Sequence, residues 1–189
     1  MKSQGVIQMD KKYYKQEVDR YIRNNPSRLM TSRFTNTTKN ENDMYKQSKK
    51  IKGSLYCTPD PISCSVPFDT NVLVLEMNND TNKIMAIGKV KNKPITGTIN
   101  VYENRNYNRF IYAGQHHIKR EDMNEEEDKI MRVFDVLCFT GNKHMKRGQG
   151  LKSFPGEMLY RMSSRIDIID FITKMFERRT MINTTTRIV

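Results

Sequence analysis

The sequence has no long apolar run and contains few cysteines and histidines. Across its 189 residues no apolar segment approaches the roughly 18–20 residues of a membrane-spanning helix, so we expect no membrane span. The opening MKSQGVIQMDKKYY is polar and lacks the apolar core of a secretory signal. Three cysteines, an odd number, do not make a disulfide framework and favour a reducing compartment. Apolar residues make up 37% of the chain, below the roughly 45–50% of an average domain, so we expect some segments outside the core.

Residues that usually carry catalysis or bind metals are sparse as well. His116 and His117 are adjacent, so on a strand they point to opposite faces and do not readily share one metal ion. Cys57 and Cys64 lack the short spacing of a zinc site, and Cys138 lies on the apolar face of an expected helix. We therefore expect no metal, no cofactor and no enzymatic activity.

Positive charge is abundant, and it is concentrated at the two ends of the chain. The formal net charge is +12. Residues 1–52 hold 13 Lys/Arg against 5 Asp/Glu, residues 174–189 hold 4 against 1, and residues 53–173 hold 16 against 15. Basic ends on a nearly neutral body suggest arms that contact a polyanion, such as nucleic acid, or an acidic protein surface. The alternative is that the charges serve solubility alone.

The N-terminal region reads as a basic arm with one short helix. Apolar residues recur at helical spacing within 10–25, and Asn24-Asn25-Pro26 ends the pattern. Such a helix needs a surface for its apolar stripe, either the central domain or another protein. Residues 31–50 are rich in Asn, Thr, Ser and Lys and predict a linker or extended arm. The expected partner-binding residues of this arm are Tyr14, Val18, Tyr21, Ile22, Arg28 and Arg33.

The central region predicts strands followed by helices. Apolar runs at 71–77 and 84–91 predict a β-hairpin, and Gly88 inside the second run indicates a bulge or a close backbone approach. Alternation predicts further strands at 97–103, 108–114 and 115–119, and helical periodicity follows at 123–139 and 155–179.

We therefore expect an α+β protein with a mostly antiparallel sheet followed by two helices. The expected division is a basic arm over 1–52, a domain over 53–177 and a basic C-terminal tail over 178–189.

A glycine-rich basic loop spans residues 141–152. Its glycines, Gly141, Gly148 and Gly150, allow the backbone to approach a phosphate, and its cations would neutralise that phosphate. The spacing is not that of a P-loop, and a soluble connection between helices is the alternative reading. The candidate contacts with nucleic acid are Lys143, His144, Lys146, Arg147 and Lys152.

A second candidate surface interleaves aromatic residues with arginines over residues 102–114. Aromatic faces stack on bases, and arginine contacts phosphate or stacks itself. Phe110 and Tyr112 are expected to be core residues, which leaves Arg105, Tyr107 and Arg109 as the candidates for exposed contacts.

One strand signature carries a family resemblance. The run VPFDTNVLVLEMNNDTNKIMAIGKVKNKP, with the signature Met85-Ala86-Ile87-Gly88-Lys89-Val90, resembles the opening of a PUA-like domain of the EVE, YTH and ASCH type. The resemblance covers residues 66–155 and implies a pseudo-barrel fold that often binds RNA or modified nucleic acid. EVE and YTH readers usually enclose a modified base in a cage that includes tryptophan. This chain has none, so tyrosine or phenylalanine would have to take that place.

The same resemblance suggests two functions. The segments 104–109 and 146–151 are similar to proteins of nucleocytoplasmic large DNA viruses, which implies a location in the host cytoplasm or the virion. The first expected function is a non-enzymatic nucleic-acid-binding module, for RNA or DNA. The alternative is a virion structural protein, a minor capsid component whose arms thread between neighbouring capsid proteins.

Overall fold

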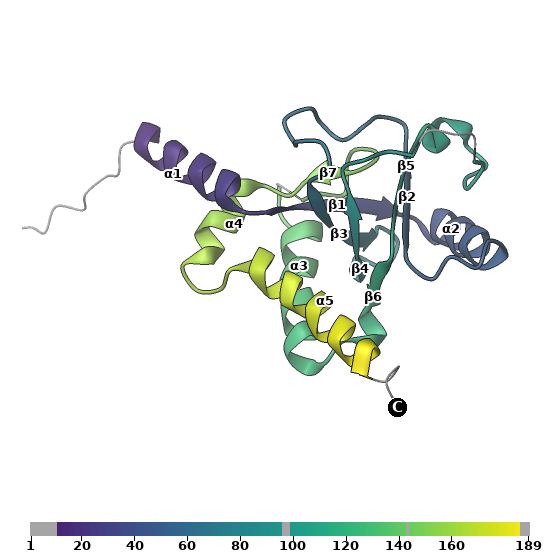
Figure 1. Cartoon of the computed structure of the whole chain (residues 1–189). Coiled ribbons are helices and arrows are strands. Elements are labelled where there is room, and N and C mark those ends of the chain that lie inside the picture. The colour runs from purple at the N-terminus through teal and green to yellow at the C-terminus, as the bar shows by residue number, and fades with distance from the viewer. Residues whose placement is uncertain (1–10, 96–98, 143, 186–189) are drawn as a thin grey trace, which may run out of the picture.

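A five-stranded, mostly antiparallel sheet forms the centre of this α+β protein (Figure 1). The computed structural model describes residues 11–95, 99–142 and 144–185. The strand order is β6-β4-β3-β1-β7, and only β1 and β3 pair in parallel. The strands are β1 (Ser27–Phe34), β3 (Asn71–Asn78), β4 (Lys83–Lys91), β6 (His116–Lys119) and β7 (Lys152–Ser153).

The predicted hairpin at the middle of the sheet is confirmed. β3 and β4 pair antiparallel from Asn71 opposite Lys91 to Asn78 opposite Lys83. The apolar side chains of β3 are buried on both faces of the strand, as expected for a strand covered on two sides. The predicted strands that became β5 (Phe110–Gly114) and β6 are confirmed too.

The predicted linker at 31–50 is wrong. β1 occupies a central place in the sheet and pairs along its length with β3, and α2 (Asn36–Ser48) follows it directly. Thr31 and Ser32 are buried although they are polar. Thr31 pairs with β3 on one side and β7 on the other, Ser32 pairs with β3, and their small hydroxyl side chains fit the interior. A reciprocal capping box between Thr35 and Thr38 starts α2.

A second, two-stranded sheet covers one face of the large sheet. It consists of β2 (Ser54–Thr58) and β5. Gly88 is a point of close approach, as its place in the strand suggests, because a Cβ there would overlap the Tyr56 hydroxyl and Ser54 Oγ. The expected strand at 97–103 falls partly outside the described residues, and the described residues 99–103 form no strand. Within the described ranges the two sheets do not close into a barrel.

Helices cover the opposite face of the large sheet. The predicted helix at 123–139 is confirmed as α3 (Glu125–Phe139), which an Asn124–Glu127 capping box starts. The pattern at 155–179 is two helices, α4 (Gly156–Ser163) and α5 (Ile168–Thr185), rather than one. The Asp167 carboxylate accepts from Ile169 N at 3.0 Å and so caps the start of α5. The expected basic tail at 178–189 does not begin as a separate segment, because its first residues continue α5.

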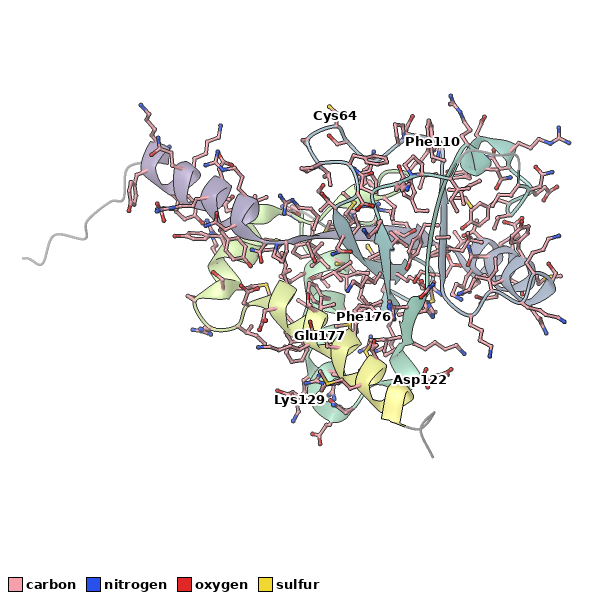
Figure 2. All side chains as sticks on the ribbon, viewed as in Figure 1. Cys64, Phe110, Asp122, Lys129, Phe176 and Glu177 are labelled. Atoms are coloured by element: carbon pink, nitrogen blue, oxygen red, sulfur yellow. The ribbon has the colours of Figure 1, made fainter. Side chains whose placement is uncertain are left out.

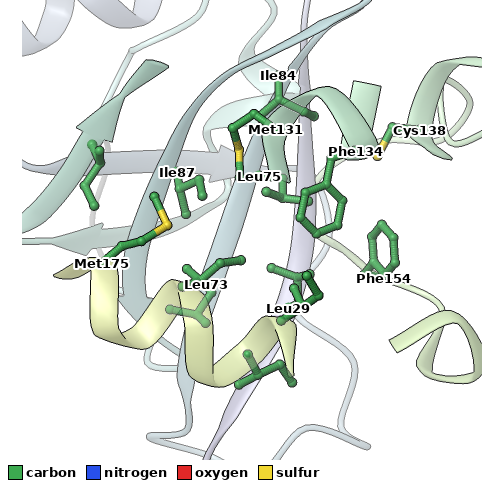
Figure 3. Close-up of a cluster of buried hydrophobic side chains, with 14 of the residues drawn as sticks. Leu29, Leu73, Leu75, Ile84, Ile87, Met131, Phe134, Cys138, Phe154 and Met175 are labelled. Carbon is green, nitrogen blue, oxygen red and sulfur yellow. The ribbon is translucent and has the colours of Figure 1, made fainter. Parts of the chain in front are cut away.

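Two apolar clusters lie on the two faces of the sheet. The face that we call the helix face is packed by α3, α4 and α5, and Phe134 and Phe154 meet edge to face at 5.3 Å (Figure 3). The other face, which we call the cavity face, packs against β2, β5 and the loops around them. No helix in the described part of the chain has the length and apolar character to cross a membrane.

Candidate functional site

A cavity of about 190 Å³ opens where β1 ends, at the border of the cavity face. It is smaller than the roughly 300–1,000 Å³ of typical drug-sized ligand pockets, so it has room for a small group only. Five separate segments line it: the end of β1 with the start of α2, β2, the turn after β3, and the two loops around residues 102–107 and 148–150. The lining residues are Ser32, Arg33, Phe34, Thr35, Thr38, Cys57, Asn79, Tyr102, Tyr107, Gly148, Gln149 and Gly150.

Arg33 contributes a desolvated cation to this cavity. Its Nε donates to the Met145 carbonyl at 2.5 Å, while its Nη1 is buried with no hydrogen-bond partner. Among the described residues no carboxylate pairs with Arg33. Burial lowers the pKa of Arg33, although the neighbouring Cys138 thiol opposes this shift. Arginine remains charged throughout the physiological range, so the cavity holds an unpaired positive charge.

Asn79 also lines the cavity and leaves an acceptor unused. Its backbone N–H donates to the Phe34 carbonyl at 2.8 Å, which ties the turn after β3 to the end of β1. Its Nδ2 donates to the Lys146 carbonyl at 3.1 Å, and its Oδ1 is buried without a partner. A buried polar atom without a partner is unfavourable, by about 1–3 kcal/mol, and points to a water or ligand atom that would satisfy it.

The glycine-rich loop closes one side of the cavity. Gly148 and Gly150 have φ angles of +104° and +66°, in a region that residues with a side chain adopt only under strain. In the same loop, the carbonyls of Met145 and Lys146 accept from Arg33 and Asn79. The two side chains therefore fix the loop against the end of the sheet.

Two tyrosines form the aromatic wall. The rings of Tyr102 and Tyr107 meet edge to face with centroids 6.2 Å apart. Asn42 of α2 donates from Nδ2 to the Tyr102 hydroxyl and to the Leu55 carbonyl, each at 3.1 Å. Asn108 Oδ1 accepts from the backbone N–H of Tyr102 at 3.0 Å, and its Nδ2 donates to the Tyr102 carbonyl at 2.7 Å. Buried asparagines thus hold Tyr102 by both its backbone and its side chain.

Cys57 contributes an uncharged side chain to the lining of the cavity. Burial raises the pKa of its thiol to about 12, so it stays protonated near neutral pH. All three cysteines are free, with Cys57 and Cys138 buried and Cys64 exposed. In the described ranges no three His, Cys, Asp or Glu side chains are grouped to hold a metal ion.

Of the sequence-predicted contacts with nucleic acid, only Tyr107 lines this cavity. Gly148 and Gly150 of the 141–152 loop line it as well, and a Cβ on Gly148 would lie 3.8 Å from Cε of Lys152. Arg105 and Arg109 are exposed in or beside the short helix η1 (Arg105–Asn108), and the Arg109 guanidinium lies 5.9 Å from the Phe110 ring centroid. Among the remaining predicted contacts, Arg147 is exposed, His144 and Lys146 are half-buried, and Lys143 lies outside the described residues.

The predicted arm residues divide between two places. In α1 (Lys11–Asn24), which confirms the expected short helix, Val18 is buried and Ile22 lies against Gly156 of α4. Tyr14 and Tyr21 of α1 pack edge to face on Tyr160. The apolar stripe of this helix therefore rests on its own chain. Arg28 lies near the start of β1, where Nη1 donates to the Asn25 carbonyl at 2.7 Å, and Arg33 lies at the cavity.

Sequence reasoning missed Asn79, Thr38 and Cys57 as cavity residues, and it assigned Arg33 to an arm. These residues come from the β1–α2 segment, from β2 and from the turn after β3, and no spacing along the chain relates them. The one signal available was Asn79 itself, in the polar turn of the predicted hairpin.

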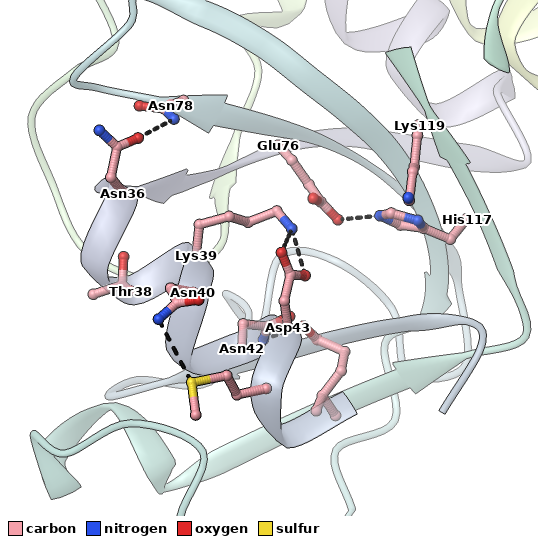
Figure 4. Close-up of polar contacts among 12 residues, drawn as sticks. Asn36, Thr38, Lys39, Asn40, Asn42, Asp43, Glu76, Asn78, His117 and Lys119 are labelled. Carbon is pink, nitrogen blue, oxygen red and sulfur yellow. Dashed lines mark hydrogen bonds and ion pairs between the residues drawn. The ribbon is translucent and has the colours of Figure 1, made fainter. Parts of the chain in front are cut away.

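A buried ionisable cluster lies beneath α2 on the cavity face (Figure 4). Glu76 Oε1 accepts from the Tyr56 hydroxyl at 2.8 Å and lies 2.8 Å from His117 Nε2. Burial alone would raise the pKa of Glu76, but the contacts with His117, Lys39 and Tyr56 outweigh it and lower the pKa. Tyr56, Glu76 and His117 come from β2, β3 and β6, so these contacts connect the three strands.

Comparisons of this chain with protein-family models, with curated proteins and with solved structures find no match.

Proposed function

We propose that this protein is a non-enzymatic nucleic-acid-binding module that holds one base of RNA or DNA in the cavity. The observation that carries the proposal is the convergence of an aromatic wall, an unpaired buried arginine and a glycine-rich loop on one small cavity. Aromatic faces stack on bases with little dependence on sequence, and polar groups at the cavity floor would meet the edge of the base.

The exposed cations around the cavity would contact the phosphates. Arg105 and Arg109 flank Tyr107 on one side, and Arg147 and Lys152 lie on the glycine-rich loop on the other. Such contacts release counterions from the nucleic acid, so affinity falls with rising salt.

The PUA-like fold assignment is part of the same proposal. Its support is the close approach at Gly88, which lets β2 lie against β4 and brings the small sheet over the large one. The cavity lies at the edge of this two-sheet arrangement.

The test measures binding of the full chain to short labelled single-stranded RNA and DNA at two salt concentrations. The double substitution K146E/R147E is expected to weaken binding at least tenfold at low salt. Deleting residues 1–52 is not a usable alternative because it would remove β1 from the sheet.

The matched control is K129E/R132E, which makes the same change of charge on exposed positions of α3. Lys129 lies at the far end of the molecule from Phe110, the neighbour of Arg109 (Figure 2). Equal losses in both variants would mean that general positive charge accounts for the binding, and this would contradict a specific site.

A further inference from the structure

One edge of the large sheet connects the cavity to α1. After the glycine-rich loop the chain continues as β7, where Lys152 pairs with Thr31 of β1. The next element, α4, starts at Gly156, and a Cβ on this residue would lie 2.2 Å from Cδ1 of Ile22 in α1. Figure 1 places α1 at one end of β1 and α2 at the other. The segment 148–156 therefore follows the edge of the sheet from the cavity to α1.

Exposed cations lie at both ends of this edge. Arg147 and Lys152 are at the cavity end, and Lys15 and Arg23 are on α1. Within the described ranges none of these four side chains forms a salt bridge. As a whole α1 carries five basic residues against two acidic ones. Because its apolar stripe already rests on α4, the exposed part of this helix is polar and positively charged.

The length of β1 sets the distance between the two groups of cations. Its eight residues, at about 3.3 Å per residue, span roughly 26 Å. Phosphates in a stacked strand follow one another at about 3.4 Å, so about eight nucleotides cover this distance. An unstacked strand covers it with fewer.

We propose that a nucleic-acid strand held in the cavity continues along the β7 edge and places its phosphates on the exposed cations of α1. This inference rests on the proposed function and defines the extent of the same site. The support is charge complementarity, because the edge ends in cations without carboxylate partners and the strand carries one negative charge per nucleotide. A strand long enough to reach both places meets α1 at a high effective concentration once its base is in the cavity.

The experiment measures the affinity of the full chain for single-stranded oligonucleotides of 4 and 12 nucleotides. A longer strand also offers more positions to the cavity, so each length is compared between wild type and the variant K15Q/R23Q. We expect the variant to bind the longer strand about fivefold to tenfold more weakly at low salt, with a salt slope lower by about 1.4. For the shorter strand, which cannot reach α1, we expect a change of less than about twofold.

The matched control is K129Q/R132Q, which removes the same charge from exposed positions of α3. It is expected to leave the affinity for both lengths within about twofold of wild type. A loss in the control equal to that in K15Q/R23Q would overturn the inference, because charge alone would then explain the effect of α1.

Two further outcomes separate this inference from the proposed function. If K15Q/R23Q binds the longer strand as tightly as wild type, or loses affinity equally for both lengths, the inference is overturned. The proposed function stands in that case provided that Tyr107→Ala still weakens binding of the shorter strand. Absence of binding to both lengths would overturn the inference and the proposed function together.

Discussion

The two faces of the central sheet differ in the side chains that cover them. The helix face is filled by aliphatic, methionine and phenylalanine side chains of α3, α4 and α5. The cavity face also has an apolar cluster, but it buries the polar side chains of Asn42, Glu76 and Asn108 and borders the cavity. Buried polar groups add geometric specificity more than stability. The helix face therefore supplies the main apolar core, and the cavity face is where we propose that the site lies.

Phe134→Ala on the helix face is the change with the largest expected effect on stability. Phe134 is fully buried and packs edge to face on Phe154, so truncation would remove transfer free energy and leave a hole. We expect the free energy of unfolding to fall by about 3–5 kcal/mol in urea titrations. A loss below about 1 kcal/mol would contradict the assignment of the main stabilising core to this face.

Glu76→Gln on the cavity face tests the buried ionisable cluster. The folded pKa of Glu76 is lower than its ordinary value of 4.5, so the folded state binds fewer protons than the unfolded state in that range. Its contribution is therefore present above about pH 5 and is lost as the pH falls through the folded pKa.

We expect Glu76→Gln to lower the free energy of unfolding by about 1–3 kcal/mol at pH 7 and by less at pH 3. Urea titrations at several pH values measure this difference. A difference between wild type and variant that stays constant with pH would show that the charge of Glu76 is not the stabilising feature.

Asn42→Ala is expected to have a smaller effect on the free energy of unfolding and to weaken oligonucleotide binding as well. It removes the donors to the Tyr102 hydroxyl and the Leu55 carbonyl, for a loss of about 1–2 kcal/mol. Because Tyr102 then loses its side-chain anchor, we expect weaker oligonucleotide binding with an unchanged salt dependence. Denaturation and binding isotherms on the same preparation check both parts.

Arg147→Gln is expected to have the smallest effect on stability, within about 0.5 kcal/mol, because the side chain is exposed. Its expected effect is on binding, through a lower slope of affinity against salt. A thermal melt beside a salt series measures the two effects. A large loss of stability would place Arg147 in the packing of the loop instead.

Sequence patterns predicted the elements whose side chains are apolar at a regular spacing. β3, β4 and α3 belong to this group. When one or two faces of an element are buried, its apolar residues recur in the sequence at the period of that element. β1 escaped prediction because Thr31, Ser32 and Arg33 interrupt its apolar pattern, although all three are at least half-buried. The place of β1 in the sheet depends on its backbone pairing with β3 and β7, and the hydropathy of the sequence does not reveal that pairing.

The candidate site could be predicted only in part for a related reason. Tyr107 and the 148–150 glycines have local signatures, an aromatic between arginines and glycines among lysines. Arg33 and Asn79 are remote in sequence. The parallel pairing of β1 with β3, and the hydrogen bond from the Asn79 N–H to the Phe34 carbonyl, bring the turn after β3 to the end of β1, where one polar atom of each side chain has no partner.

We propose that a base occupies the cavity while the surrounding cations bind phosphate. The most direct measurement is the affinity of wild type and Tyr107→Ala for one single-stranded oligonucleotide across a salt series. Loss of one stacked ring is expected to lower affinity by about 1–3 kcal/mol at every salt concentration, with a slope parallel to that of wild type. Unchanged affinity in Tyr107→Ala, with binding still sensitive to salt, would contradict the claim and leave only charge-driven association.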